Sequence, residues 1–394
     1  MRALWQRLRP VRMGWTVCFL LVAYPLGSNQ ILLGEVTPSG PIVILELVDQ
    51  EDIYISGEEG YHTYRIPSLL VAADGTLLAF CEGRKHGRGD SGDIDLLLKR
   101  WDPAGKVWTH QSIVWDDGPN TCGNPCPVLD RQTGTIWLWM THNLGVDREP
   151  EIVAKKSRGT RTVWLTHSND NGRTWSPPMD MTEKVKLKNW TWYATGPGCG
   201  IQTQSGRLVI PCDHVDDAGN RGSHVLYSDD HGQTWHLGGS AGPQTNECEV
   251  VELAGGRLLL NMRNYNRKYP SRAIAESFDG GLTWSAVRYD MTLVEPICQA
   301  SIRRIEGLSL DGQPVIAFSN PADPKERKRL TVRVSADSCE SWPWGLEVWP
   351  GPAAYSCLAS LADGTLLVLY ERGNTHPYER ITLARIAVRV ASAP

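Results

Sequence analysis

One eight-residue pattern recurs along the chain and limits what the chain can fold into. The pattern Ser-x-Asp-x-Gly-x-Thr-Trp occurs as "SNDNGRTW" at 168–175, "SDDHGQTW" at 228–235 and "SFDGGLTW" at 277–284. A degenerate fourth copy, "SADSCESW", spans 335–342 and has Cys339 where glycine is expected. An Asp side chain accepts backbone N–H groups in tight turns, and Gly adopts backbone angles that other residues resist. Each octet is therefore predicted to be a hairpin turn that marks one supersecondary unit.

The spacing of the octets predicts the architecture. Their first residues lie 60, 49 and 58 positions apart, and strand-like apolar runs such as "TVWLTHS" stand beside them. A unit of about 50 to 60 residues is the size of a four-stranded propeller blade. The stretch "YHTYRIPSLLVAADGTLLAF" (61–80) fits such a unit as a β-hairpin, because Asp-Gly between apolar runs is a strong hairpin signal. We predict an all-β fold, a six-bladed β-propeller of four-stranded antiparallel blades.

The N-terminal segment has the composition of a targeting sequence. The apolar stretch "MGWTVCFLLVAYPLG" (13–27) has the length of a signal-peptide core and is short of the roughly 20 apolar residues of a membrane span. A positively charged start precedes it, formed by Arg2, Arg7, Arg9 and Arg12. We therefore assign residues 1–40 to a signal peptide or anchor with its linker, and residues 41–394 to the propeller domain. The protein is expected to be exported, either secreted or periplasmic, with an uncleaved membrane anchor as the alternative.

Charge and cysteine content exclude several functional classes. The net charge of −4 gives no reason to expect a nucleic-acid partner. No pair of Cys-x-x-Cys motifs and no histidine cluster with metal spacing occurs in the sequence, so we expect neither a metal nor another cofactor. Cys122 and Cys126 are close enough in sequence to bridge if the loop between them bends, and spacing alone leaves this open. "NWT" at 189–191 is an N-glycosylation sequon.

The octet together with "YRIP" (64–67) makes the chain resemble the exo-α-sialidases, or neuraminidases, that carry Asp-box repeats. The resemblance extends from about residue 50 to residue 390, and it is to the bacterial and lysosomal sialidases. It implies a glycoside hydrolase that removes terminal sialic acid. Asp-boxes alone also occur in non-catalytic propellers, so the scattered site residues decide the function.

The resemblance implies a carboxylate-binding site made of three arginines. Sialidases hold the C1 carboxylate of the sugar in this way, because planar guanidinium groups bind a carboxylate bidentately. Arg65 of "YRIP" is the first, and Arg263 in "LLLNMRN" is the second. Arg327 in "FSNPADPKERKRLTVR" is the best match for the third, with Arg329 and Arg333 as rivals.

The resemblance also implies three catalytic residues. Tyr355 in "PAAYSCLASL" matches the nucleophile, and Glu247 in "TNECEVVEL" matches the carboxylate that activates it. Asp90 in "GRGDSGD" is our choice for the acid/base, with Asp93 and Asp95 as rivals. A tyrosine is suited to this substrate because the anomeric carbon already bears a carboxylate, which would repel a charged nucleophile. A phenol is a weak nucleophile at neutral pH and therefore needs a base beside it.

Four further residues are assigned from the same resemblance. Glu371 in "VLYERG" matches the carboxylate that orients the first arginine, and Arg84 is expected to reach the pocket near the acid/base aspartate. Trp192 and Tyr193 stand in a Gly-rich stretch that resembles segments lining the sugar pocket. They are expected either to face the sugar or to belong to the core of a blade.

We interpret the sequence as that of a retaining exo-α-sialidase that acts through a tyrosyl covalent intermediate. Its partners would be sialylated glycans, glycoproteins or glycolipids. A trans-sialidase or an intramolecular, anhydro-forming sialidase would use the same residues and is the first alternative. A sialic-acid-binding propeller without turnover is the second, and a propeller that acts as a protein-interaction platform is the third.

Overall fold

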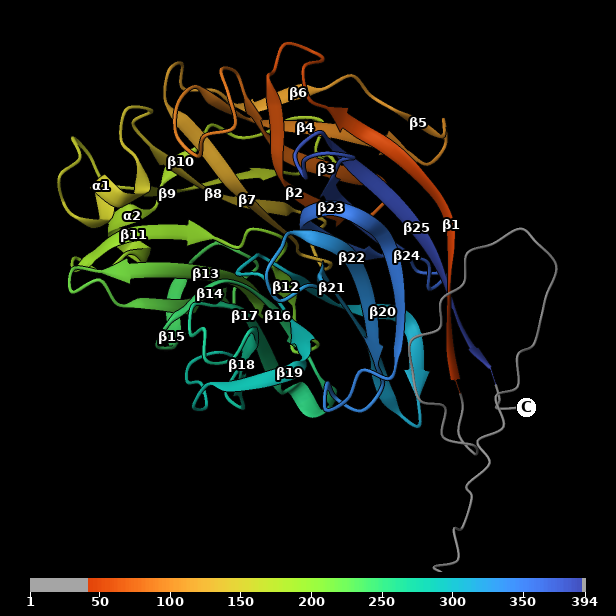
Figure 1. Ribbon diagram of the computed structural model, residues 1–394. Helices are drawn as coiled ribbons and strands as arrows, with labels where there is room; N and C mark the ends of the chain where they lie inside the picture. The colour runs from red at the N-terminus through yellow and green to blue at the C-terminus, as the bar shows by residue number, and fades with distance from the viewer. Residues whose placement is uncertain (1–41, 392–394) are drawn as a thin grey trace, which may run out of the picture. The chain divides into compact units, whose positions relative to one another are not determined.

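The computed structural model describes residues 42–391, which fold almost entirely into antiparallel β-sheets (Figure 1). The helical elements are short: α1 (Glu149–Val153), α2 (Thr182–Val185) and a 3-10 turn, η1 (Ala254–Gly256). None of the helices in this range is long and apolar enough to span a membrane. The all-β prediction is confirmed, and the predicted signal peptide or anchor at residues 1–40 lies outside the described residues.

The first half of the described chain forms two sheets. The larger has nine strands and is joined in its middle by a single parallel bridge between Ile94 and Thr121. Its strands are β2 (Thr63–Val71), β3 (Leu77–Arg84), β4 (Ile94–Asp102), β5 (Val107–Trp108), β6 (Ser112–Trp115), β7 (Thr121–Leu129), β8 (Ile136–Asn143), β9 (Thr162–Ser168) and β10 (Met179–Asp180). The next sheet contains β11 (Trp190–Thr195), β12 (Ile201–Gln202), β13 (Leu208–Asp216), β14 (Arg221–Ser228) and β15 (His236–Ala241).

The second half forms a four-stranded and a seven-stranded sheet. The four strands are β16 (Thr245–Glu252), β17 (Leu258–Asn264), β18 (Ser271–Ser277) and β19 (Arg288–Val294). The seven are β20 (Ser301–Leu310), β21 (Gln313–Pro321), β22 (Lys328–Ser335), β23 (Trp344–Ser360), β24 (Leu366–Arg372), β25 (Arg380–Ala391) and β1 (Ile42–Ile55). The long strand β23 pairs with β22 through its first half and with β24 through its second half, so it belongs to two successive units.

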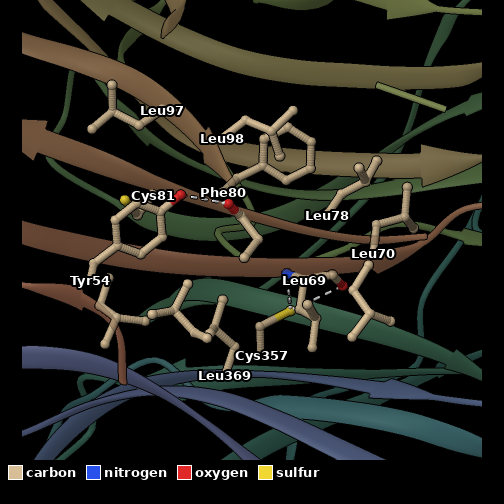
Figure 2. Packing of buried hydrophobic residues seen from close by; sticks show 14 of the residues in the cluster. Tyr54, Leu69, Leu70, Leu78, Phe80, Cys81, Leu97, Leu98, Cys357 and Leu369 are labelled. Atoms are coloured by element: carbon tan, nitrogen blue, oxygen red, sulfur yellow. Dashed lines mark hydrogen bonds between the residues drawn. The ribbon is translucent and has the colours of Figure 1, made fainter. Parts of the chain in front are cut away.

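The apolar runs of the sequence form strands that are buried on both faces. The predicted hairpin is confirmed: β2 pairs with β3, Leu70 lies opposite Leu78, and Gly75 occupies the turn with φ +84°. Figure 2 shows Leu69 and Leu70 of this hairpin packed with Phe80, and with Cys357 and Leu369 from the C-terminal strands. Each fully buried side chain of this size contributes about 1.5–3 kcal/mol, so these contacts hold neighbouring sheets together.

The first strands of successive units form a closed ring. β2 contacts β7, β7 contacts β12, β12 contacts β16, β16 contacts β20, β20 contacts β23, and β23 contacts β2 again. The closing sheet takes its outer strand from the other end of the chain, because β1 pairs antiparallel with β25, from Ile42 opposite Ala391 to Ile55 opposite Arg380. This ring places the starts of several first strands next to one another.

The octets are hairpin turns, as predicted. In the second copy the Ser228 hydroxyl accepts the Gly232 N–H at 2.8 Å, and the Asp230 carboxylate accepts the Thr234 N–H at 2.8 Å and the Thr234 hydroxyl at 2.6 Å. The degenerate fourth copy makes the same bonds with serine in place of threonine, and Cys339 adopts φ +66° in the position of glycine. The turn therefore survives the loss of glycine at the cost of local backbone strain.

The Asp side chain of an octet is expected to contribute stability that depends on pH. Bonds from Thr234 lower the pKa of Asp230 to about 2. Because the pKa is lowered by folding, the contribution is complete above about pH 4 and is lost as the pH falls toward 2. Asp230→Ala should reduce the free energy of unfolding by about 1 kcal/mol at pH 7, the effect of losing a side-chain cap. Denaturant unfolding of both proteins at pH 7 and pH 2.5 measures this, and an undiminished difference at the lower pH would contradict it.

The cysteine question left open by the sequence is answered by the structure. Cys122 and Cys126 both lie in β7, and both are buried free thiols rather than a disulfide. Cys122 pairs with His142 and Cys126 with Trp139 along the same neighbouring strand, with a register shift between them. The two cysteines therefore act as small buried side chains of β7.

Candidate active site

Arg65 is held in place by a buried carboxylate. Its side chain is only 4% exposed, and its Nε and Nη2 donate to the two carboxylate oxygens of Glu371 at 3.0 and 3.4 Å. Glu371 is fully buried and also accepts the backbone N–H groups of Ile66 and Tyr355, at 2.9 and 3.1 Å. One carboxylate thus fixes the first arginine and ties β2 to β23, which is the relation predicted for these two residues.

The backbone beside Arg65 is irregular, and this irregularity sets the direction of the arginine. The pairing of β2 with β3 slips between Arg65 and Ser68, and Ile66 adopts φ +60°. A β-branched residue in that region is strained, and a bulge turns the side chains next to it. The bond from Ile66 N–H to the buried glutamate holds the strained backbone in place, as is common at functional sites.

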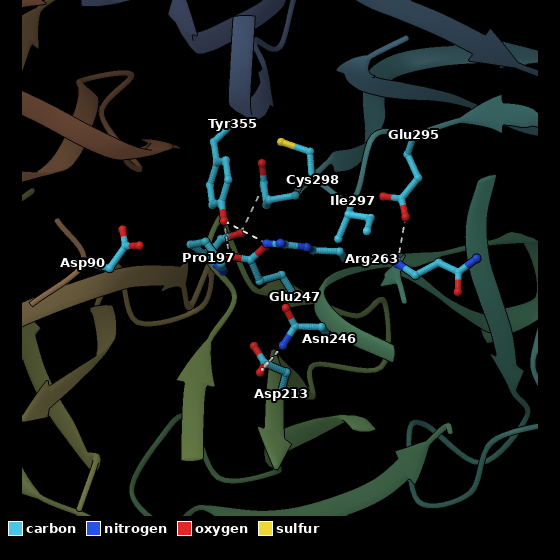
Figure 3. Close-up of polar contacts among 12 residues, drawn as sticks. Asp90, Pro197, Asp213, Asn246, Glu247, Arg263, Glu295, Ile297, Cys298 and Tyr355 are labelled. Carbon is cyan, nitrogen blue, oxygen red and sulfur yellow. Dashed lines mark hydrogen bonds and ion pairs between the residues drawn. The ribbon is translucent and has the colours of Figure 1, made fainter. Parts of the chain in front are cut away.

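Tyr355 and Glu247 are joined by a hydrogen bond beside an arginine. The Tyr355 hydroxyl donates to one Glu247 oxygen at 2.6 Å, and Arg263 Nη1 donates to the other at 2.6 Å (Figure 3). Arg263 Nη1 also donates to the Tyr355 hydroxyl at 3.1 Å. Burial raises the pKa of Tyr355 and the Glu247 charge raises it further, while the arginines lower it; the net pKa is well above the usual value. The phenol is therefore neutral at rest, and Glu247 accepts its hydrogen bond.

The three predicted arginines surround this tyrosine. Arg263 touches its hydroxyl, and the guanidinium carbons of Arg65 and Arg327 lie 5.0 and 5.5 Å from the centre of its ring. Arg327 is fixed by bonds to the Tyr378 hydroxyl at 2.6 Å and to a backbone carbonyl at 3.3 Å. Its rival Arg329 instead pairs with Glu347 at the surface, at 2.8 Å. The other rival, Arg333, lies on β22 in register with Phe318 and Gly345 and makes none of these contacts.

Of the three aspartates considered for the acid/base, Asp90 is the one beside the arginines. Its side chain is 76% exposed, and its Oδ1 accepts from Arg84 at 2.7 Å and from Arg65 at 3.3 Å. Asp93 pairs with Lys85 at 2.9 Å, and the fully buried Asp95 accepts the Tyr61 hydroxyl at 2.5 Å. Through these bonds Asp93 and Asp95 hold neighbouring segments of the protein together.

The charge state of Asp90 is set by its neighbours. Desolvation raises its pKa, but the positive charges of Arg84 and Arg65 outweigh this and leave the pKa below the usual value. Arg84 is itself buried and anchored to Glu82 through bonds of 2.6 and 3.1 Å. In Figure 3 the Asp90 carboxylate lies to one side of the Tyr355–Glu247 pair.

The structure adds a residue that the sequence did not indicate. The ring of Tyr378 lies 3.8 Å from the guanidinium carbon of Arg65, and its hydroxyl accepts the bond from Arg327. It therefore sets the spacing between the first and third arginines by a stack on one and a hydrogen bond to the other. Tyr378 stands in the polar connection "GNTHPYER" between β24 and β25, and nothing in that stretch distinguishes it as a site residue.

The two aromatic residues that the sequence left undecided have different surroundings. Tyr193 is fully buried among apolar side chains and belongs to the core. Trp192 is 8% exposed, and its ring lies 4.4 Å from the guanidinium carbon of Arg161. Arg161 is buried and donates to Asn143 at 2.5 Å, to Thr141 at 2.8 Å and to Asn124. Trp192 therefore covers a buried polar network.

Comparison with known proteins shows the family to which the chain is similar. The family model described as a BNR repeat-like domain matches residues 75–368. The sialidase of Micromonospora viridifaciens is 34% identical over 357 residues, covering 86% of this chain and 54% of that protein. Human Sialidase-3 is 32% identical over 383 residues, covering 81% of this chain and 88% of that protein. The chain thus spans about half of the bacterial relative and most of the human one.

Solved structures show the same fold. The Hadza microbial sialidase Hz136 superposes with a TM-score of 0.77 at 30% identity, covering 87% of this chain and 68% of that one. The intramolecular trans-sialidase of Ruminococcus gnavus has the same fold at 19% identity, with a TM-score of 0.71 over 85% of this chain and 96% of that one. The family model and the relatives above 30% identity each cover most of the chain, so the chain belongs to the sialidase family of glycoside hydrolases.

Proposed function

We propose that this chain is a retaining exo-α-sialidase that hydrolyses terminal sialic acid from glycoconjugates through a covalent tyrosyl intermediate. The observation that carries the proposal is the 2.6 Å bond from the Tyr355 hydroxyl to Glu247 inside a group of three arginines. A nucleophile with its base in contact is the arrangement that covalent catalysis requires. The arginines supply positive charge for both the substrate carboxylate and the developing phenolate.

Substrate binding follows from the fixed arginines. The C1 carboxylate of the sugar would lie between Arg65, Arg263 and Arg327, each already held by a carboxylate or a hydroxyl group. Because the protein orders these side chains before the substrate arrives, little conformational entropy is lost on binding. The site should therefore discriminate strongly against sugars that lack a carboxylate, since such sugars would form no ion pairs with the three arginines.

Bond cleavage requires a proton on Asp90. The arginines hold the Asp90 pKa down in the free protein, and the incoming substrate carboxylate offsets the charge of Arg65 beside it. Substrate binding is thus expected to raise the Asp90 pKa and to make it a proton donor to the leaving oxygen. Tyr355 attacks the anomeric carbon as its own proton passes to Glu247.

The second half of the reaction restores the enzyme. Asp90, now ionised, takes a proton from a water molecule, and this water displaces Tyr355 from the anomeric carbon. Glu247 returns a proton to the phenolate. Two inversions at one carbon give overall retention of configuration.

We also propose that the fold has six blades. The support is the closed ring of first strands, which consists of β2, β7, β11 continued by β12, β16, β20 and the second half of β23. Antiparallel partners follow each of them, so that the strands outside the ring complete units of about four strands.

The proposed reaction is tested with an aryl α-sialoside, following the first-formed product by proton NMR. Release of the α-anomer of sialic acid supports retaining hydrolysis. A 2,7-anhydro sugar would indicate the intramolecular reaction instead, and sialylation of added lactose would indicate transfer. Binding of sialic acid without turnover would overturn the enzyme assignment in favour of a binding propeller.

Replacing Asp90 should lower kcat/KM by an amount that depends on the leaving group of the substrate. In Asp90→Asn, kcat/KM for sialyllactose should fall by about 10²–10⁴, because the leaving sugar hydroxyl needs a proton. The kcat/KM for an aryl sialoside with an acidic phenol should fall far less, because this leaving group needs no proton. Asp93→Asn is the matched control in the same loop and should remain close to the parent. Equal losses on both substrates would show that Asp90 is not the proton donor.

A further inference from the structure

A cavity of about 560 Å³ lies at the end of the strand ring away from the catalytic residues. On three first strands it is lined by positions further along the chain than the site residue. Val71 follows Arg65 on β2, Val251 follows Glu247 on β16, and Leu358 follows Tyr355 on β23. Three to six residues of strand correspond to about 10–20 Å, so the two sites are separate. The volume is in the usual range of roughly 300–1,000 Å³ for small-molecule sites.

The cavity contains an under-partnered arginine. Arg303 on β20 donates from Nη1 to the Gly200 carbonyl at 3.1 Å, while its buried Nε has no partner. Among residues 42–391, no carboxylate oxygen lies within 4 Å of its guanidinium, a separation at which the structure records ion pairs elsewhere. Buried cations in proteins are normally paired with an anion. Arg303 is half-buried and has no carboxylate of the described residues at ion-pair distance, so its guanidinium can accept a further anion.

The buried acid Glu249 acts on Arg303 from a distance but forms no ion pair with it in the described part of the chain. The oxygens of Glu249 accept bonds from the Ser301 hydroxyl at 2.8 Å and from the Ile302 N–H at 2.9 Å on one side, and from the Cys199 N–H at 3.2 Å on the other. Burial raises the pKa of Glu249 to about 7, so near neutral pH much of it is uncharged. Burial lowers the pKa of Arg303, but the nearby Cys199 and Glu249 raise it above its usual value, so the guanidinium remains a cation.

The mouth of the cavity adds further positive charge. Arg131 and Arg304 both line it, and within the described part of the chain neither is paired with a carboxylate. Arg131 donates through Nη2 to the backbone carbonyls of Gln202 and Thr203, at 3.0 and 3.2 Å. Glu252 and Glu306 are the acidic residues of the lining, so three arginines face two glutamates. The balance of charge favours an anion.

The walls between the mouth and Arg303 are mostly apolar. They are formed by Leu69, Leu70, Val71, Val128, Leu129, Ile201, Val251, Leu358 and Ala359. An inorganic anion on Arg303 would leave these side chains in contact with water, whereas a ligand with a hydrocarbon tail would cover them. We propose that this cavity binds a small organic carboxylate with a short unbranched apolar tail, the carboxylate on Arg303 and the tail along the Leu70 and Val128 walls.

The proposal is tested by calorimetric titration of the full protein with butanoate, hexanoate and octanoate, and with hexan-1-ol as the uncharged analogue. The affinity should rise about fourfold for each added methylene, as expected for burial of a CH₂ group. Hexan-1-ol should not bind measurably. Arg303→Gln should weaken octanoate binding at least tenfold, whereas Arg329→Gln, which changes a surface arginine outside the cavity, should leave it unchanged.

A second variant keeps the test decisive if Arg303→Gln is destabilised. Ala362 lies exposed at the mouth of the cavity, and Ala362→Trp should close it without disturbing the core. This variant is expected to lose octanoate binding and to keep its turnover of an aryl sialoside, because the site of Tyr355 is remote. The proposal is overturned if no carboxylate binds the parent, if butanoate binds as well as octanoate, or if the folded variants bind octanoate like the parent.

Discussion

Tyr355→Phe is expected to lower kcat on an aryl sialoside by about a thousandfold or more, with little change in the fold. The substitution removes the oxygen that attacks the anomeric carbon and the donor of the 2.6 Å bond to Glu247, and it leaves the ring in place. Loss of a nucleophile that acts together with its base is among the largest single effects in enzymes. The three arginines remain, so sialic acid should still bind within about tenfold of the parent affinity.

The measurement is single-turnover kinetics with quantification of any protein-bound sugar by mass spectrometry. The parent trapped with a 3-fluoro sialosyl donor should gain one sugar on Tyr355, and the variant should gain none there. Tyr370→Phe is a matched control, because its hydroxyl is buried on the neighbouring strand β24 without a hydrogen-bond partner. A variant at Tyr355 that keeps more than a tenth of the parent kcat would refute the assignment of the nucleophile.

Glu371→Leu is expected to have the largest effect on stability, about 3–5 kcal/mol of the free energy of unfolding. Glu371 is fully buried and holds both the Arg65 guanidinium and two backbone N–H groups. Without it a buried cation loses its main counter-charge, and the strained backbone at Ile66 loses the bond that holds it. The variant should therefore have both a lower affinity for the substrate carboxylate and a lower free energy of unfolding.

Denaturant unfolding and calorimetric binding of sialic acid separate the two consequences. Glu347→Leu is the control, because it removes the partner of Arg329 at the surface, where an ion pair is worth about 0–1 kcal/mol. Glu371→Gln keeps a hydrogen-bond acceptor without the charge. Its free energy of unfolding should lie between those of Glu371→Leu and Glu347→Leu. If Glu371→Leu unfolds at the same denaturant concentration as Glu347→Leu, the buried pair does not have the structural role assigned to it.

The local features of the fold could be predicted because their causes are local. The octets contain within eight residues every group that closes the turn, from Ser228 to Thr234 in the second copy. The hairpin at 61–80 likewise depends on adjacent residues alone. The resemblance to a known family supplied the scattered residues, such as Glu247 and Tyr355, which are 108 positions apart in the chain and in contact in space.

Other features could not be predicted because they depend on which strands become neighbours. Tyr378 becomes a site residue only when the connection after β24 returns beside β2. The positive φ of Ile66 depends on a bond from a glutamate 305 positions away. In the sequence Arg303 is only a polar residue of a strand, and the unbonded Nε that it brings into the cavity is visible only when the walls of the cavity are assembled.

The pairing of β1 with β25 has a consequence for biosynthesis. Ile42 lies opposite Ala391, so β1 can pair only after β25 has been synthesised. The ring cannot close while the C-terminal strands are still inside the ribosome, and closure over so long a loop is intrinsically slow. During translation the strands of the first sheets expose unpaired edges, which are the surfaces most prone to aggregation. Production of the intact protein is therefore expected to depend on how well the emerging chain is protected until residue 391 is released.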